Sequence, residues 1–292
     1  MRSTAQPQAE QPGPPSQTGA NHPHNGMPIL TGGGSPAEHL TEETRDFYLR
    51  SLKVLDDAGI RYAVGGAYSL AHYAGIVRHT KDLDVFVRHH DCQRVLDVFK
   101  KAGYRTEMTH PHWLGKAYER DDFIDVIYGS GNGLCRVDDE WMDHAVEGDV
   151  LGRRAPLCPA EEIIWSKSFV QERNRFDGAD IHHLLLARGH EFDWPRLMRR
   201  FAGHERVLLS HLIVFGYVYP SERGQVPVRV IAELMDRVRG EPPTGERVCR
   251  GTALSWSQYL IDVRERGFAD GRLKPHGLMS PEQVERWTEA EK

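Results

Sequence analysis

Residues 60–87, IRYAVGGAYSLAHYAGIVRHTKDLDVFV, limit the folds open to this chain more than any other stretch. A short apolar run ends in Gly65-Gly66, an amphipathic segment follows, and a second apolar run carries Asp82 and Asp84. Because a strand points successive side chains to opposite faces, the two aspartates should project from the same face. Two carboxylates on one face near a glycine turn indicate a site for metal and phosphate.

The flanking residues predict an alternation of helices and strands. Helices are expected at 40–58, 67–73 and 91–102, and strands at 61–64, 81–87, 104–108, 112–118 and 123–128. Thr41 and Asp91 are the expected caps of the first and third helices, and Gly75 should end the second. Asp125 lies in the last strand, FIDVIY, where an ionised carboxylate is costly unless it is paired or metal-bound.

Beyond residue 150 the pattern becomes helical. Helices are expected at 159–170, 177–187, 194–201, 207–219, 228–239, 255–266 and after a capping pair of Ser280 and Gln283. Residues 1–38 form an expected disordered tail, because they carry too little aliphatic surface to offset their ordering entropy. The expected domains are a core at 39–157, a helical accessory domain at 158–240 and a C-terminal helical extension at 241–292.

Composition narrows the class of protein. The 292 residues, 39% of them hydrophobic, suffice for about two domains. A net charge of −5 argues against binding to nucleic acid or anionic membrane through bulk charge, although a local basic groove stays open. The four cysteines form no CxxC pair, and the longest apolar run, 207–219, is too short to cross a bilayer. We therefore expect a protein of the cytoplasm with no membrane partner.

Nucleotidyl transfer from a triphosphate makes demands that these residues meet. Divalent cations must neutralise the phosphates, and clustered carboxylates on rigid strands hold such ions. Asp82, Asp84 and Asp125 would supply the cluster. Gly65-Gly66 before a helix would let backbone N–H groups approach the phosphates, because no side chain stands in the way.

With these features the chain resembles the DNA polymerase beta-like nucleotidyltransferases, in particular their bacterial minimal, antibiotic-modifying and abortive-infection toxin-like members. The resemblance covers roughly residues 45–150. It is carried by Val64-Gly65-Gly66, a short helix, the Asp-x-Asp of residues 82–84 between apolar residues, and Asp125 on a later strand. Residues 78–84, RHTKDLD, also look like the R-x-T-x-D-x-D form of the toxin-like branch. Fifteen residues separate Gly66 from Asp82, slightly more than is usual, which a turn inserted around residues 75–77 would explain.

The resemblance implies an α+β fold class, with a nucleotidyltransferase-fold core of a mixed sheet flanked by helices, followed by an α-helical domain. It also implies two Mg²⁺ ions and an NTP as co-substrate. The implied roles are metal binding by Asp82, Asp84 and Asp125, proton acceptance by Asp125, contacts to the phosphates from Gly65, Gly66 and Ser69, and charge compensation by Lys167 with Arg78 or Lys81.

The expected reaction is transfer of an NMP from an NTP, such as ATP, to a hydroxyl of a small molecule, an RNA or a protein, with release of pyrophosphate. The alternative is a catalytically idle nucleotide-binding module, such as a regulatory or toxin-antitoxin component, although the third aspartate favours the enzyme. A metal-dependent phosphohydrolase would need more histidines near the site than His79.

Several further residues are considered as parts of the site. Residues 110–113, HPHW, line the acceptor pocket or form an ordinary turn. His182-His183 cannot chelate as a helical i, i+4 pair would, and His22 and His24 are expected to be solvent-exposed. Asp121 and Asp122 rank below Asp125 as metal ligands, and Trp113, Trp165 and Trp194 are expected in the core or between domains. The sequence assigns no oligomeric state, and no role to residues 241–292.

Overall fold

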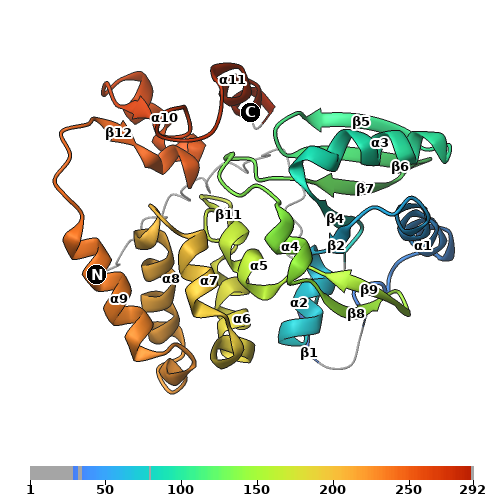
Figure 1. Cartoon of the computed structure of the whole chain (residues 1–292), viewed down its shortest axis with the longest axis horizontal. Helices are drawn as coiled ribbons and strands as arrows, with labels where there is room; N and C mark the ends of the chain where they lie inside the picture. The colour runs from blue at the N-terminus through green and yellow to red at the C-terminus, as the bar shows by residue number, and fades with distance from the viewer. Residues whose placement is uncertain (1–28, 32–34, 79, 291–292) are drawn as a thin grey trace, which may run out of the picture.

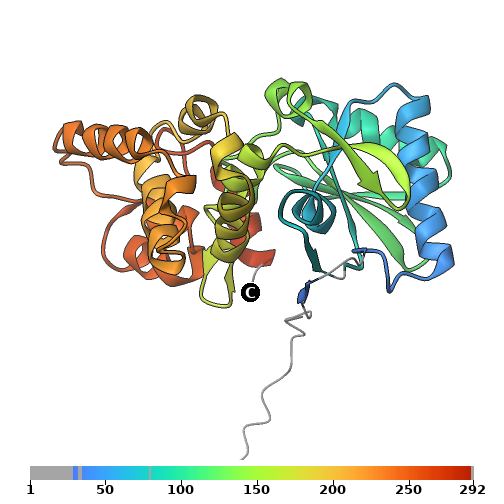
Figure 2. The ribbon, with the colours of Figure 1, turned by 90° about the horizontal axis from the view of Figure 1, so that it is seen from below.

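The computed structural model describes residues 29–31, 35–78 and 80–290. A sheet with flanking helices lies beside a second, helical part, and the end of the chain lies between the two (Figures 1 and 2). This arrangement confirms the expected fold class, a mixed sheet flanked by helices and followed by further helices.

The large sheet has seven strands in the order β5-β6-β7-β4-β2-β9-β8. Their bounds are β2 Tyr62–Val64, β4 Leu83–Val87, β5 Arg105–His110, β6 Leu114–Glu119, β7 Asp122–Ile127, β8 Val146–Val150 and β9 Arg153–Leu157. Strand β4 pairs antiparallel with β2 and parallel with β7, so the two halves of the candidate motif are adjacent in the sheet. The β8-β9 hairpin was not predicted, because its sequences VEGDV and RRAPL lack an apolar run.

Four helices accompany this sheet: α1 Glu42–Asp57, α2 Gly66–Ala74, α3 Cys92–Lys101 and α4 Asp139–Asp143. Thr41 caps α1 as predicted, since its hydroxyl accepts the N–H of Thr44 at 3.2 Å. Gly75 ends α2 in the left-handed conformation, also as predicted. Asp91 precedes α3 but does not cap it, because its carboxylate instead accepts from Nε of Arg88 at 2.6 Å.

The segment between α2 and β4 differs from the expectation. Residues 76–78 do not form an inserted turn; they form strand β3 Ile76–Arg78, which pairs antiparallel with β1 Ile29–Thr31. Residues 29–31, which fall within the expected tail of residues 1–38, thus form a strand. The predictions for His22, His24 and His79 lie outside the described residues.

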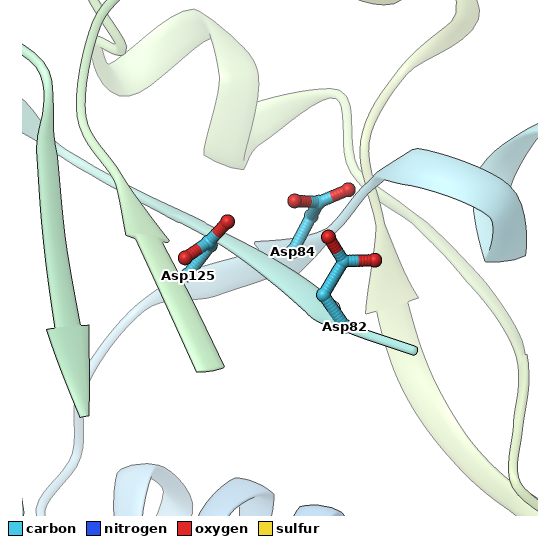
Figure 3. A group of neighbouring side chains, drawn as sticks. All are labelled: Asp82, Asp84 and Asp125. Atoms are coloured by element: carbon cyan, nitrogen blue, oxygen red, sulfur yellow. The ribbon is translucent and has the colours of Figure 1, made fainter. Parts of the chain in front are cut away.

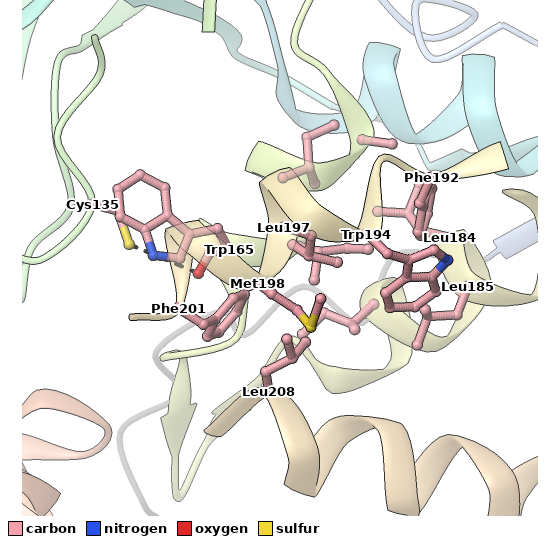
Figure 4. Packing of buried hydrophobic residues seen from close by; sticks show 14 of the residues in the cluster. Cys135, Trp165, Leu184, Leu185, Phe192, Trp194, Leu197, Met198, Phe201 and Leu208 are labelled. Atoms are coloured by element: carbon pink, nitrogen blue, oxygen red, sulfur yellow. Dashed lines mark hydrogen bonds between the residues drawn. The ribbon is translucent and has the colours of Figure 1, made fainter. Parts of the chain in front are cut away.

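The helical part consists of α5 Ala160–Lys167, α6 Gly178–Arg188, α7 Trp194–Arg200, α8 Glu205–Val218 and α9 Val228–Gly240, with a hairpin of β10 Gln171–Glu172 and β11 Arg175–Phe176 after α5. Its core gathers apolar side chains from α5 to α8, among them the expected interior aromatics Trp165 and Trp194 (Figure 4). A buried ion-pair group fixes α7 to α5: Glu162, 0% exposed, accepts from Arg196 at 2.7 Å and from Arg200 at 3.3 Å.

The chain ends in an extension with β12 Val248–Cys249, η4 Arg250–Ala253, α10 Trp256–Arg264, β13 Ala269–Asp270 and α11 Pro281–Ala290. Ser280 and Gln283 exchange the predicted capping bonds at the start of α11. The fully buried Arg272 bonds to Asp270 at 2.7 Å and holds this segment together. Among the described residues, no helix is long and apolar enough to span a membrane.

Candidate active site

Three carboxylates meet on one side of the sheet. Asp82 lies just before β4, Asp84 lies within it, and Asp125 stands opposite Asp84 in the parallel β4-β7 ladder. Each offers an oxygen, and these oxygens all lie within 4.8 Å of one another (Figure 3). The structure therefore brings together the three aspartates that the sequence singled out.

The cluster is short of positive charge. Burial, with the neighbouring charges of Asp82 and Asp125, raises the pKa of Asp84 to about 7. Burial also raises the pKa of Asp125, although the ammonium of Lys116, 2.7 Å from its Oδ1, opposes that shift. Closely spaced oxygen donors with this surplus of negative charge fit a hard divalent cation such as Mg²⁺.

Lys116 was not identified from the sequence. It lies on β6 directly opposite Asp125 in an antiparallel ladder, and its ammonium lies 3.9 Å from the centre of the Phe123 ring. Only the register of β6 against β7 places it there, and a single sequence does not encode that register in any local signal.

The glycine pair lies against the carboxylates. Gly65 N–H donates to the backbone oxygen of Asp84 at 3.0 Å, and Gly66, with φ of +55°, starts α2. A Cβ on Gly66 would collide with the carboxylate of Asp84, and a Cβ on Gly65 would collide with the Phe86 ring. Glycine is therefore required at both positions, and the free N–H groups of the first turn of α2 begin beside the cluster.

A cavity of about 400 Å³ contains Gly65, Gly66, all three aspartates and Lys167 in its wall. Lys167 Nζ bonds to Asp177 at 2.7 Å and to Asp180 at 2.8 Å. Burial opposes its charge, but these two carboxylates outweigh burial and raise its pKa. Lys167 thus remains a cation beside the carboxylate cluster.

The other three predicted phosphate contacts are not in the cavity wall. Ser69 is fully buried, and its hydroxyl donates to the Val64 carbonyl at 2.6 Å. Arg78 pairs with Asp180 behind Lys167, and Lys81 is exposed. Spacing along α2 and before β4 suggested proximity to the glycines, but the helix rotation and the strand direction turn these side chains away.

Three parts of the chain enclose the cavity. The core adds Phe86, Trp113, Ile127 and residues 129–132; the helical part adds Ile163, Ser166, Phe169, Val170, Glu172, Arg175 and Asp177; the C-terminal extension adds Thr252, Ala253, Leu254, Trp256 and Trp287. The sequence analysis placed Lys167 of the helical part at the site, but nothing in the sequence indicated that the C-terminal extension would line this cavity.

The structure places the histidines of residues 110–113 and of the His182-His183 pair. Of residues 110–113, Trp113 lines the cavity, while the His110 ring stacks on Trp113 with centroids 5.7 Å apart. His182 is buried against His211, and burial lowers its pKa to about 4. Within the described ranges, the three aspartates are the only group of metal-binding side chains close enough to share an ion.

Parts of this chain are similar to known proteins. The family described as aminoglycoside-2''-adenylyltransferase matches residues 49–126. No curated protein sequence matches the chain. Among solved structures, the antibiotic-resistance factor ANT(2'')-Ia is 16% identical, with 58% of this chain and 96% of that chain covered and a TM-score of 0.42.

Two further structures are similar. The lincosamide antibiotic adenylyltransferase LnuA, bound to lincomycin, is 17% identical, with 49% of this chain and 96% of that chain covered and a TM-score of 0.33. JHP933 from Helicobacter pylori is 16% identical, with 68% and 97% covered and a TM-score of 0.33. The family match spans the glycine pair and all three aspartates. The core of the chain is thus similar to nucleotidyltransferases over the residues that form the candidate site.

Proposed function

We propose that this protein transfers the NMP group of an NTP to a hydroxyl of a small molecule and releases pyrophosphate. The observation that carries the proposal is the single cavity that joins the carboxylates of Asp82, Asp84 and Asp125 to the glycine pair and to Lys167. ATP is the first nucleotide to test, because the family that matches residues 49–126 is one of adenylyltransferases.

Different groups of the protein would bind the metal, bind the phosphates and accept the proton. Asp82, Asp84 and Asp125 would hold Mg²⁺, which supplies charge neutralisation at the triphosphate and lowers the pKa of the attacking hydroxyl when it is bound. Backbone N–H groups in the first turn of α2, beginning with Gly66, would bind phosphate oxygens, since the N–H of Gly65 already donates to the Asp84 carbonyl. Lys167 would offset the charge of the phosphates. Asp125 is placed to accept the proton of the hydroxyl.

The shape of the cavity supports a small acceptor. The sheet, the β10-β11 hairpin and the C-terminal extension all contribute to its wall, and its volume of about 400 Å³ is that of a small-molecule site. We further propose that residues 39–157 act as the catalytic core and that the helical parts complete the substrate site. The four cysteines are free, which supports the cytoplasmic location that the sequence predicts.

The test is an incubation with α-labelled ATP, Mg²⁺ and one of three acceptors: tobramycin, whose adenylyl form is in complex with ANT(2'')-Ia in a solved structure; lincomycin, which is bound to LnuA; or the low-molecular-mass fraction of a bacterial extract. We expect magnesium-dependent pyrophosphate release with label on a small molecule. The double variant Asp82→Asn/Asp84→Asn should lose both, whereas Asp97→Asn, on an exposed aspartate of α3, should keep them. Calorimetric binding of ATP with no pyrophosphate release would instead establish the idle nucleotide-binding module.

A further inference from the structure

The C-terminal extension contributes to the wall of the catalytic cavity. Residues 252–254 of η4 and its end, Trp256 at the start of α10, and Trp287 of α11 all line it. Both tryptophans keep part of their surface exposed, as does Trp113 of the core. Three partly exposed indoles in one cavity give it a strongly aromatic wall, and two of the three come from residues beyond the helical domain.

Hydrogen bonds fasten this extension to the helical part. The N–H of Gln171 donates to the Leu254 carbonyl at 3.1 Å. The carboxylate of Glu172 accepts from the hydroxyl of Ser255 at 2.5 Å, from the N–H of Trp256 at 2.9 Å and from the hydroxyl of Ser257 at 2.9 Å. A carboxylate with three donors fixes the start of α10 firmly to the β10-β11 hairpin.

Other contacts fasten it to the core. Asn132 Nδ2 donates to the Ala253 carbonyl at 2.9 Å. The Trp287 ring meets the rings of His110 and Trp113 edge to face, with centroids 5.2 and 5.5 Å apart. A Cβ on Gly131 would overlap the Trp287 ring, so the two pack closely. The extension therefore bridges the two parts of the molecule across the cavity, as its position in Figures 1 and 2 also shows.

The geometry of nucleotidyl transfer determines whether the NTP or the acceptor contacts the aromatic wall of the cavity. Attacking and leaving oxygens of a phosphoryl-type transfer lie roughly in line. If pyrophosphate leaves beside Gly66, at the β2 side of β4, the acceptor must approach from the other side, over β7 and β6. On that side, Asp125 and Ile127 face the cavity about 7 Å apart along β7, and Trp113 lies just before β6.

We infer that Trp287 and Trp113 form the acceptor subsite, and that the acceptor is a small hydroxylated molecule whose ring packs against their indole rings. The C-terminal extension thus determines acceptor specificity. This inference rests on the proposed function, because it presumes transfer over the three aspartates.

The experiment follows label from α-labelled ATP with Mg²⁺, offered the small-molecule and macromolecular fractions of a bacterial extract together with tobramycin and lincomycin. The acceptor labelled by the wild-type protein is then titrated against Trp287→Ala, Trp287→Phe and the control Tyr259→Ala. Tyr259 is a 41% exposed aromatic residue of the same extension that does not line the cavity.

We expect Trp287→Ala to raise the KM for the acceptor roughly tenfold, with the KM for ATP changed less than about twofold, and Trp287→Phe to be intermediate. Tyr259→Ala should leave both constants unchanged. If Trp287→Ala does not fold, Trp287→Phe decides by the same split between the two constants. An unchanged acceptor KM in a folded Trp287 variant overturns the inference while the proposed function stands, whereas label on macromolecules alone overturns both. No transfer by the wild-type protein would overturn the proposed function itself.

Discussion

Replacement of Asp84 by Asn should stabilise the metal-free protein at alkaline pH while it abolishes metal binding. In the folded state, burial and the charges of Asp82 and Asp125 raise the pKa of Asp84 from an ordinary value of 3.8 to about 7. Between these two values the folded state holds a proton that the unfolded state has lost. The free energy of unfolding therefore falls as pH rises from about 4 to about 7 and stays low above that range.

A rise in pKa from 3.8 to about 7 corresponds to at most about 4 kcal/mol. Asparagine has nearly the shape of the protonated acid and does not ionise, so Asp84→Asn should recover much of that free energy at pH 8. At pH 4, where the wild-type carboxyl is itself protonated in the folded state, the gain should vanish.

The assay is urea unfolding in EDTA at pH 4 and pH 8, followed by circular dichroism, for the wild-type protein, Asp84→Asn and the exposed control Asp97→Asn. Addition of Mn²⁺ at pH 8 should stabilise the wild-type protein and the control but not Asp84→Asn. If Asp84→Asn were less stable than the wild-type protein in EDTA at pH 8, the account of a strained carboxylate cluster would be wrong.

Three further changes test neighbouring features. Gly66→Ala should abolish transfer and Mn²⁺ binding, because the new Cβ would collide with Asp84. Gly75 is the control, because it has a similar φ but no atom lies within 4 Å of the position of an added Cβ. Gly75→Ala should cost only about 1 kcal/mol of unfolding free energy and keep both transfer and Mn²⁺ binding. Lys116→Met should shift the pH midpoint of Mn²⁺ binding upward in calorimetric titrations, because Lys116 lowers the pKa of Asp125; an unchanged midpoint would remove that role. Glu162→Ala should lower the free energy of unfolding in urea by about 1.5–3 kcal/mol, since it removes the fully buried carboxylate that Arg196 and Arg200 share but leaves Arg196 its pair with Glu161 and Arg200 its pair with Asp138. Loss of the exposed Glu233-Arg237 pair by Glu233→Ala should cost less than about 1 kcal/mol.

The sequence predicts what local physics controls. Alternation and apolar flanks locate β4 and β7, Thr41 and Gly75 mark the ends of their helices, and Gly65-Gly66 with the three aspartates identify the centre of the site. Side-chain directions were less predictable. Ser69 turns inward to the Val64 carbonyl because of its place on α2, and Arg78 becomes part of a strand.

The site residues that the sequence did not predict are placed by contacts between distant segments. Lys116 reaches Asp125 only through the register of two strands, and Trp287 reaches the cavity only through the path of the last forty residues or so. Neither contact has a periodic or motif-like signal, because each depends on how elements pack after they have formed. The sequence therefore indicates the carboxylate side of the site and, through residues 110–113, part of its aromatic side, but not the tryptophans of the C-terminal extension.

The pairing of Asp84 with Asp125 also bears on how this site tolerates change. The two carboxylates are held by a parallel ladder, and the chain between β4 and β7 leaves the sheet for α3 and returns by the β5-β6 hairpin. Insertions or deletions at the exposed turns of that excursion would leave the ladder register, and hence the oxygen positions, unchanged. A shift of one residue within β7 would instead turn Asp125 to the opposite face. The length of the connection can therefore change without moving the third carboxylate, whose position depends on its strand and not on a fixed distance along the sequence.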